Sequence, residues 1–89
     1  MEIKKSAVAG TMESSDAYVE IAPGTQGVEI RLESVVYAQF GDSIREVVEQ
    51  VLREMQVENA NIRIVDRGAL ECVIRARVET AVLRGGEDA

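Results

Sequence analysis

The side chains that could do chemistry are few, and two neighbouring serines stand first among them. Ser14 and Ser15 lie within residues 10–16, a run of small and polar side chains that predicts a loop. Serine hydroxyls in loops commonly bond to nearby backbone amides, which is the simplest role for both residues. The chemical alternative is covalent modification, because an exposed loop hydroxyl is accessible to an enzyme that supplies its own base.

Five other polar side chains have both a chemical and a structural interpretation. Glu13 and Asp16 could act as an acid–base pair, but nothing in the sequence distinguishes the two carboxyls, so we expect solvent-exposed loop carboxylates. Cys72 adjoins the apolar stripe of the last predicted helix, which favours a small packing residue over a reactive thiol. Arg75 and Arg77 could bind an anionic group, yet a solvent-exposed helix face is the simpler expectation.

The composition argues against a self-sufficient hydrolase or metalloenzyme. The 89 residues include one cysteine and no histidine, so an internal disulfide, a multi-thiolate metal site and a Ser–His or Cys–His pair are excluded. The net charge of −6 repels nucleic acid and anionic membrane surfaces, so we expect neither as a partner. No apolar run is long enough to cross a bilayer and no secretory signal is recognisable, which predicts a cytoplasmic location.

Alternating apolar residues predict three strands in the N-terminal part of the chain. Residues 2–9 alternate loosely and suggest an edge strand, whereas residues 17–21 and 28–33 alternate clearly. Between the last two, residues 22–27 contain one proline and two glycines and predict a turn. We therefore expect the second and third strands to form a hairpin.

The C-terminal part predicts two helices separated by a strand. Apolar residues spaced by three and four predict a helix over 40–55, and Ser43 with Glu46 matches the capping box of a helix N-terminus. Residues 61–65 predict a short strand. Residues 69–84 fit both a strand period and a helical stripe, and we expect a helix because the pattern is too long for a typical strand.

These elements predict one domain that spans residues 1–89, with a flexible tail over 85–89. The expected fold class is α+β, in the order β-β-β-α-β-α. It would be a two-layer sandwich, in which a mostly antiparallel sheet of about four strands carries two helices on one face.

Three blocks of the sequence resemble motifs of the citrate lyase acyl carrier protein family, the gamma subunits of citrate lyase. They are AVAGTMESSD at 7–16, QFGD at 39–42 and DRGALECVIRAR at 66–77. The blocks occur in the order and at the spacing of that family, and the resemblance spans nearly the whole chain. A malonate decarboxylase-type carrier, which shares the layout, and an unmodified α+β protein-interaction module remain the alternatives.

The resemblance implies a carrier rather than a catalyst. In the family, the serine that matches Ser14 carries 2′-(5″-phosphoribosyl)-3′-dephospho-coenzyme A through a phosphodiester, and Ser15 matches a variable position. The terminal thiol of that group would carry acetyl and citryl thioesters. The implied partners are the alpha subunit (an acyl transferase), the beta subunit (a citryl lyase) and a prosthetic-group transferase. No metal and no catalytic residue of the chain's own is implied.

Overall fold

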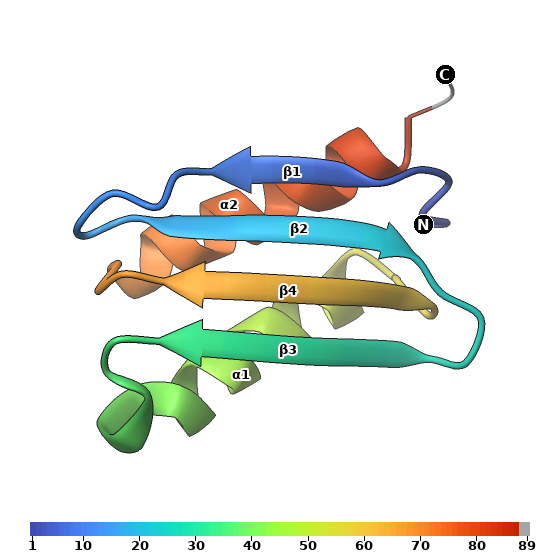
Figure 1. Cartoon of the computed structure of the whole chain (residues 1–89). Coiled ribbons are helices and arrows are strands. Elements are labelled where there is room, and N and C mark those ends of the chain that lie inside the picture. Colours follow the sequence, from blue (N-terminus) through green and yellow to red (C-terminus); the bar gives the residue numbers. More distant parts are fainter. Residues whose placement is uncertain (88–89) are drawn as a thin grey trace.

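The structure is a computed structural model that describes residues 1–87. Its elements follow the predicted order β-β-β-α-β-α, which is confirmed. They are β1 (Ala7–Gly10), β2 (Ala17–Pro23), β3 (Val28–Ser34), α1 (Tyr37–Glu54), β4 (Ala60–Asp66) and α2 (Glu71–Gly85). The four strands form one sheet, and both helices lie behind it in the view of Figure 1. The α+β class and the two-layer arrangement are therefore confirmed.

The sheet is mixed, and the predicted hairpin between β2 and β3 is wrong. The strand order is β1-β2-β4-β3, so that β4 lies between the two strands that we expected to pair (Figure 1). β4 pairs antiparallel with β2 and parallel with β3. The physical reason is burial: five of the seven β4 residues are buried, whereas β3 has no buried residue and suits an edge.

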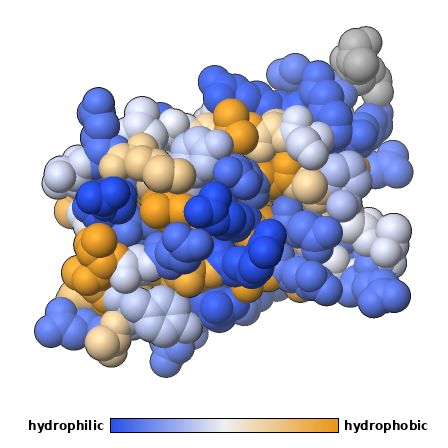
Figure 2. Space-filling model, viewed as in Figure 1, coloured by the Kyte–Doolittle hydropathy of each residue, from blue (hydrophilic) through white to orange (hydrophobic). Residues whose placement is uncertain are grey.

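One continuous core fills the space between the sheet and the helices. Every element except the edge strand β3 contributes fully buried apolar side chains, and Ile30 and Leu32 of β3 pack against them from the edge. The largest are Val19, Ile21, Val48, Val51, Leu52, Ile62, Ile64, Val78 and Val82. The opposite face of the sheet is open and bears charged side chains (Figure 2). There, Arg63 on β4 pairs with Glu20 on β2 at 3.1 Å and with Glu33 on β3 at 3.4 Å.

Helix α1 begins six residues before the predicted capping box. Its N-cap is Val36, without a side-chain hydrogen bond, and Ser43 lies exposed inside the helix, so the predicted start at Ser43 is wrong. The Val36 N–H instead donates to the Ser34 hydroxyl at 3.1 Å. As a result, the first turn of α1 lies outside the core, and Phe40, the first residue of the predicted apolar stripe, is 52% exposed.

Helix α2 confirms the helical interpretation of residues 69–84, but two details differ. Cys72 is exposed in the first turn, so the prediction of a packing residue is wrong: Ile74 and Val78 form the buried face there. The helix also includes Gly85, where we expected the tail to begin; its carbonyl accepts the N–H groups of Lys4 and Lys5 at 2.8 and 3.1 Å. The end of the predicted tail, residues 88–89, lies outside the described residues. Neither helix within residues 1–87 is long and apolar enough to cross a membrane.

Candidate functional site

Ser14 occupies an exposed corner of a tight turn between β1 and β2. The Asp16 N–H donates to the Glu13 carbonyl at 3.2 Å, which closes a four-residue turn with Ser14 and Ser15 at its centre. Ser15 has a φ of 66°, the left-handed value that the third residue of a type II turn requires. Ser14 keeps an ordinary negative φ and is exposed, as the loop prediction required.

The main chain of this turn is fastened to the end of β4. The Ser15 N–H donates to the Arg67 carbonyl at 2.8 Å, and the Arg67 N–H donates to the Asp16 carbonyl at 2.9 Å. These two bonds continue the β2–β4 ladder beyond its last strand pair, Ala17 with Asp66. The Ser14 turn is therefore an extension of the sheet rather than a free loop.

The side chain of Asp16 ties the turn to helix α2. Arg77 donates to its carboxylate through Nε at 3.0 Å and through a terminal nitrogen at 2.9 Å, a bidentate geometry. Thr11 Oγ1 and the Ala17 N–H donate to the same carboxylate at 2.6 and 2.7 Å. The bond from Arg77, followed by that from Thr11, holds the pKa of Asp16 well below its usual range. Asp16 is thus a structural anion and not a proton acceptor at neutral pH.

These contacts correct two expectations. Asp16 is not a solvent-exposed loop carboxylate, since only 15% of its side chain is accessible, and Arg77 belongs to its ion pair rather than to an open helix face. Arg75 instead bridges the two helices, donating to Glu54 of α1 at 2.6 Å. No local signal could have revealed the pair of Asp16 and Arg77, because 61 residues separate them.

The ends of β1 and β2 approach so closely that only a glycine fits at the end of β1. Gly10 has a φ of +88°, and a Cβ atom there would lie 1.9 Å from the Ala17 carbonyl oxygen and 3.0 Å from Cδ of Arg77. The missing side chain therefore lets the chain turn into the Ser14 loop and lets Arg77 reach across to Asp16.

Replacing Asp16 with asparagine is expected to lower the free energy of unfolding at neutral pH by about 1–2 kcal/mol, because the charge-assisted bonds are weakened. The pKa of Asp16 in the folded chain lies below its ordinary value of 3.8, so its stabilisation is present above that value and is lost as the pH falls below it. The difference in stability between wild type and variant should therefore shrink below about pH 4, measured by urea unfolding at several pH values. Arg77→Gln should behave in the same way, and a difference that stays constant down to about pH 3 would contradict the assignment.

Asp66 organises the neighbouring loops at the same end of the molecule. It is buried, with 1% of its surface accessible, and its carboxylate accepts the Ser34 hydroxyl at 2.8 Å and the Ala69 N–H at 2.9 Å. Its carbonyl accepts the Val35 N–H at 3.2 Å. The β3–α1 and β4–α2 connections are therefore both held by the last residue of β4, one position before the contact with the Ser14 turn.

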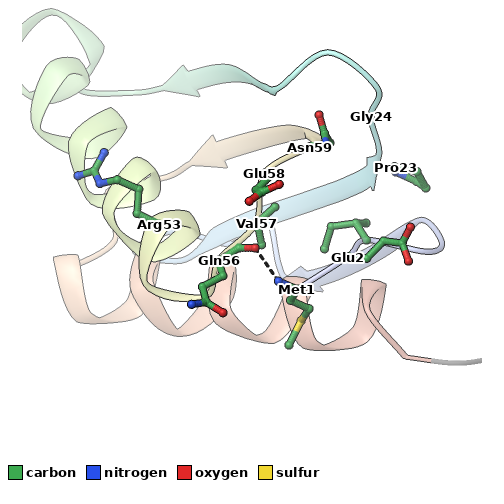
Figure 3. Close-up of a pocket in the computed structure, with 10 residues that line it drawn as sticks. Met1, Glu2, Pro23, Gly24, Arg53, Gln56, Val57, Glu58 and Asn59 are labelled. Atoms are coloured by element: carbon green, nitrogen blue, oxygen red, sulfur yellow. Dashed lines mark hydrogen bonds between the residues drawn. The ribbon is translucent and has the colours of Figure 1, made fainter.

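Two hollows lie at opposite ends of the molecule. Near Asp66, an apolar groove of about 490 Å³ opens between the starts of α1 and α2, with Phe40 and Leu70 among its lining residues. At the far end, a more polar hollow of about 890 Å³ is lined by the N-terminus and the α1–β4 loop, where the Met1 amine donates to the Gln56 carbonyl (Figure 3). No cluster of three or more acidic or cysteine side chains within residues 1–87 could hold a metal ion.

Comparisons with known proteins agree with the resemblance of the sequence blocks. The family described as "ACP: Malonate decarboxylase delta subunit (MdcD)" matches residues 4–85. The citrate lyase acyl carrier protein of Escherichia fergusonii is 51% identical, and that of Klebsiella pneumoniae 48%; each alignment covers 98% of this chain and 91% of the relative. That of Oenococcus oeni is 50% identical over 94% of this chain and 87% of its own length.

A solved structure has the same fold. One chain in the crystal structure of a Pseudomonas malonate decarboxylase hetero-tetramer in complex with malonate superposes with a TM-score of 0.84. The superposition covers 97% of this chain and 89% of that chain, at 24% sequence identity. The chain described here belongs to the family of citrate lyase acyl carrier proteins, and it is a carrier rather than a catalytic subunit.

Proposed function

We propose that this chain is the acyl carrier subunit of a citrate lyase and that Ser14 is its attachment site. The observation that carries the assignment is the exposed position of Ser14 on a fixed turn. The main chain of the next two residues, Ser15 and Asp16, is hydrogen-bonded to Arg67 at the end of β4. The attached group would be 2′-(5″-phosphoribosyl)-3′-dephospho-coenzyme A, joined by a phosphodiester to Ser14 Oγ.

The residues of the turn fit such an attachment. The exposed position of Ser14 makes it accessible to a transferase. Ser15 is less suited to this role, because its left-handed backbone and its N–H bond to Arg67 serve to form the turn. The structural anion Asp16 does not act as a base for Ser14, so the transferase would supply that base.

The contribution of the chain is to hold one point of attachment in place. When bound, the group supplies a thiol that forms a thioester and so activates the acyl group. Asp16, Arg77 and Arg67 fix the base of the arm on the sheet and on α2. A flexible arm on a fixed base makes each encounter with an active site intramolecular, which raises the effective concentration of the acyl group there.

The proposed partners are those of a citrate lyase. They are the alpha subunit as acyl transferase, the beta subunit as citryl lyase, and the prosthetic-group transferase. Residues 1–89 would act as one carrier domain in the cytoplasm. The family description that matches residues 4–85 names a malonate decarboxylase subunit. The curated relatives are citrate lyase carriers at 48–51% identity, against 24% for the malonate decarboxylase chain, and they favour citrate over malonate chemistry.

The test is the intact mass of the chain after co-expression with the prosthetic-group enzymes. We expect the wild type to gain the mass of one group and Ser14→Ala to gain none. Ser15→Gly is the matched control, since glycine accepts the φ of 66° and removes only the second hydroxyl; it should load as the wild type does.

A wild-type chain that gains no mass, or a Ser14→Ala chain that loads normally, would contradict the proposal and favour an unmodified interaction module.

A second experiment tests the activity of the loaded chain, which should restore citrate cleavage to purified citrate lyase alpha and beta subunits. If the loaded chain instead restored malonate decarboxylation to the other subunits of a malonate decarboxylase, the malonate-type alternative would be identified.

A further inference from the structure

The end of the molecule that bears Ser14 also bears most of the exposed large apolar side chains. Five of the nine such residues lie there, and each is at least 46% exposed. They are Met12, Val35, Tyr37, Phe40 and Leu70. They come from the β1–β2 loop, the β3–α1 loop with the first turn of α1, and the β4–α2 loop. The strand register brings these loops to one end, at the left of Figure 1.

The internal packing of the domain leaves these side chains uncovered. Leu70, with 72% of its surface accessible, directly precedes α2, and Phe40 extends from the first turn of α1. Both line the apolar groove between the two helix starts, whose floor includes Ile44 and Ile74. Apolar surface is visible at this end in Figure 2. A groove with exposed apolar side chains on its borders is typical of a protein–protein contact.

The charges around the groove are mostly acidic. Asp42 and Glu46 on α1 adjoin the lining residues, and Glu13 belongs to the Ser14 turn; all three are exposed. None of them forms an ion pair within residues 1–87, whereas Arg67, beside the turn, is an exposed cation at this end. With a net charge of −6 for the chain, this border favours a partner with basic side chains around an apolar centre.

We propose that this apolar end, formed by Met12, Val35, Tyr37, Phe40 and Leu70, is the docking face for the subunits that act on the arm-borne acyl group. The inference rests on the proposed function. Because the arm leaves from Ser14, a partner that docks at this end lies beside the base of the arm and within its reach. A second copy of this chain would bring two acidic borders together, and an anionic membrane would repel them. The partner surface therefore has an apolar centre with lysine and arginine at its border.

Binding of the arm-free chain to purified alpha and beta subunits tests the docking face without the prosthetic group. In a Ser14→Ala background, Leu70→Ser and Phe40→Ser are each expected to weaken binding to at least one subunit by about tenfold or more. The matched control is Leu83→Ser, because Leu83 is also exposed, at 53%, but lies near the other end of α2. It should change the affinity by less than about twofold, and binding of all chains should weaken as salt rises.

Backbone amide NMR supplies a second, independent readout. Addition of the alpha subunit should shift or broaden signals of residues 35–47 and 67–74 and leave those around Gln56 and Asn59, at the far end, unchanged. Three results would overturn the docking face. The first is an equal affinity of Leu70→Ser, Phe40→Ser and Leu83→Ser for the subunits. The others are NMR shifts confined to the far end, and self-association of the chain that Leu70→Ser abolishes. Absence of any binding by the parent chain would instead overturn the proposed partners, and the intact-mass test of Ser14 is independent of both.

Discussion

Replacing Gly10 with alanine is expected to lower the free energy of unfolding by about 3 kcal/mol or more. Two effects add: alanine is strained at a φ of +88°, and its Cβ would lie 1.9 Å from the Ala17 carbonyl oxygen. The contact is with backbone, so no side chain can rotate away to relieve it. Since a domain of this size is stable by only about 5–15 kcal/mol, the loss should be plain in urea unfolding.

Gly27→Ala separates the two effects. Gly27 has a similar φ of +85°, but nothing lies within 4 Å of the position of its Cβ. We therefore expect only the conformational cost, about 1 kcal/mol. Equal losses in the two variants would show that the close approach of β1 and β2 at Gly10 does not contribute.

Replacing Asp66 with alanine is expected to cost about 2–4 kcal/mol, because two donors lose their acceptor in a buried site. The Ser34 hydroxyl and the Ala69 N–H both donate to this carboxylate, which is 1% exposed. Their loss should loosen the β3–α1 and β4–α2 connections together. Chemical unfolding gives the free energy, and amide exchange at Val36 and Ala69 reports the local loosening.

Asp66→Asn is the conservative control. Its amide keeps one carbonyl oxygen, so it can accept one of the two hydrogen bonds, and the loss should be smaller than for alanine. If the alanine and asparagine variants were equally stable, or if both were as stable as the wild type, apolar packing rather than Asp66 would hold the β3–α1 and β4–α2 connections.

The local elements could be predicted from the sequence, because each has its own hydrophobic period. The apolar stripe of α1 from Ile44 onward and the alternation of β2 and β4 match the faces that are buried in the structure. The strand order could not be predicted in this way. A short turn after β2 suggests a hairpin, but the more apolar β4, more than 30 residues later, pairs with β2 instead.

The candidate site, too, could be predicted from the sequence only in part. The composition of residues 10–16 was enough to predict an exposed loop, and the resemblance of the 7–16 block selected Ser14 within it. The groups that hold the loop lie far along the chain. They are the main chain of Arg67 and the side chain of Arg77, whose local patterns indicate only a turn and an exposed helix face. The start of α1 could not be predicted from a capping box, because its N-cap is Val36, whose side chain makes no capping hydrogen bond.

The two backbone bonds that continue the β2–β4 ladder into the Ser14 turn have a dynamic consequence. Ser15 and Asp16 are joined to Arg67, which directly follows the most buried strand of the sheet. Breaking these bonds frays the end of the ladder between the two central strands, so we expect the turn to open at a higher free-energy cost than a loop without ladder bonds. An enzyme that modifies Ser14 thus meets a turn that is already folded, and a protease finds there an exposed segment that rarely extends.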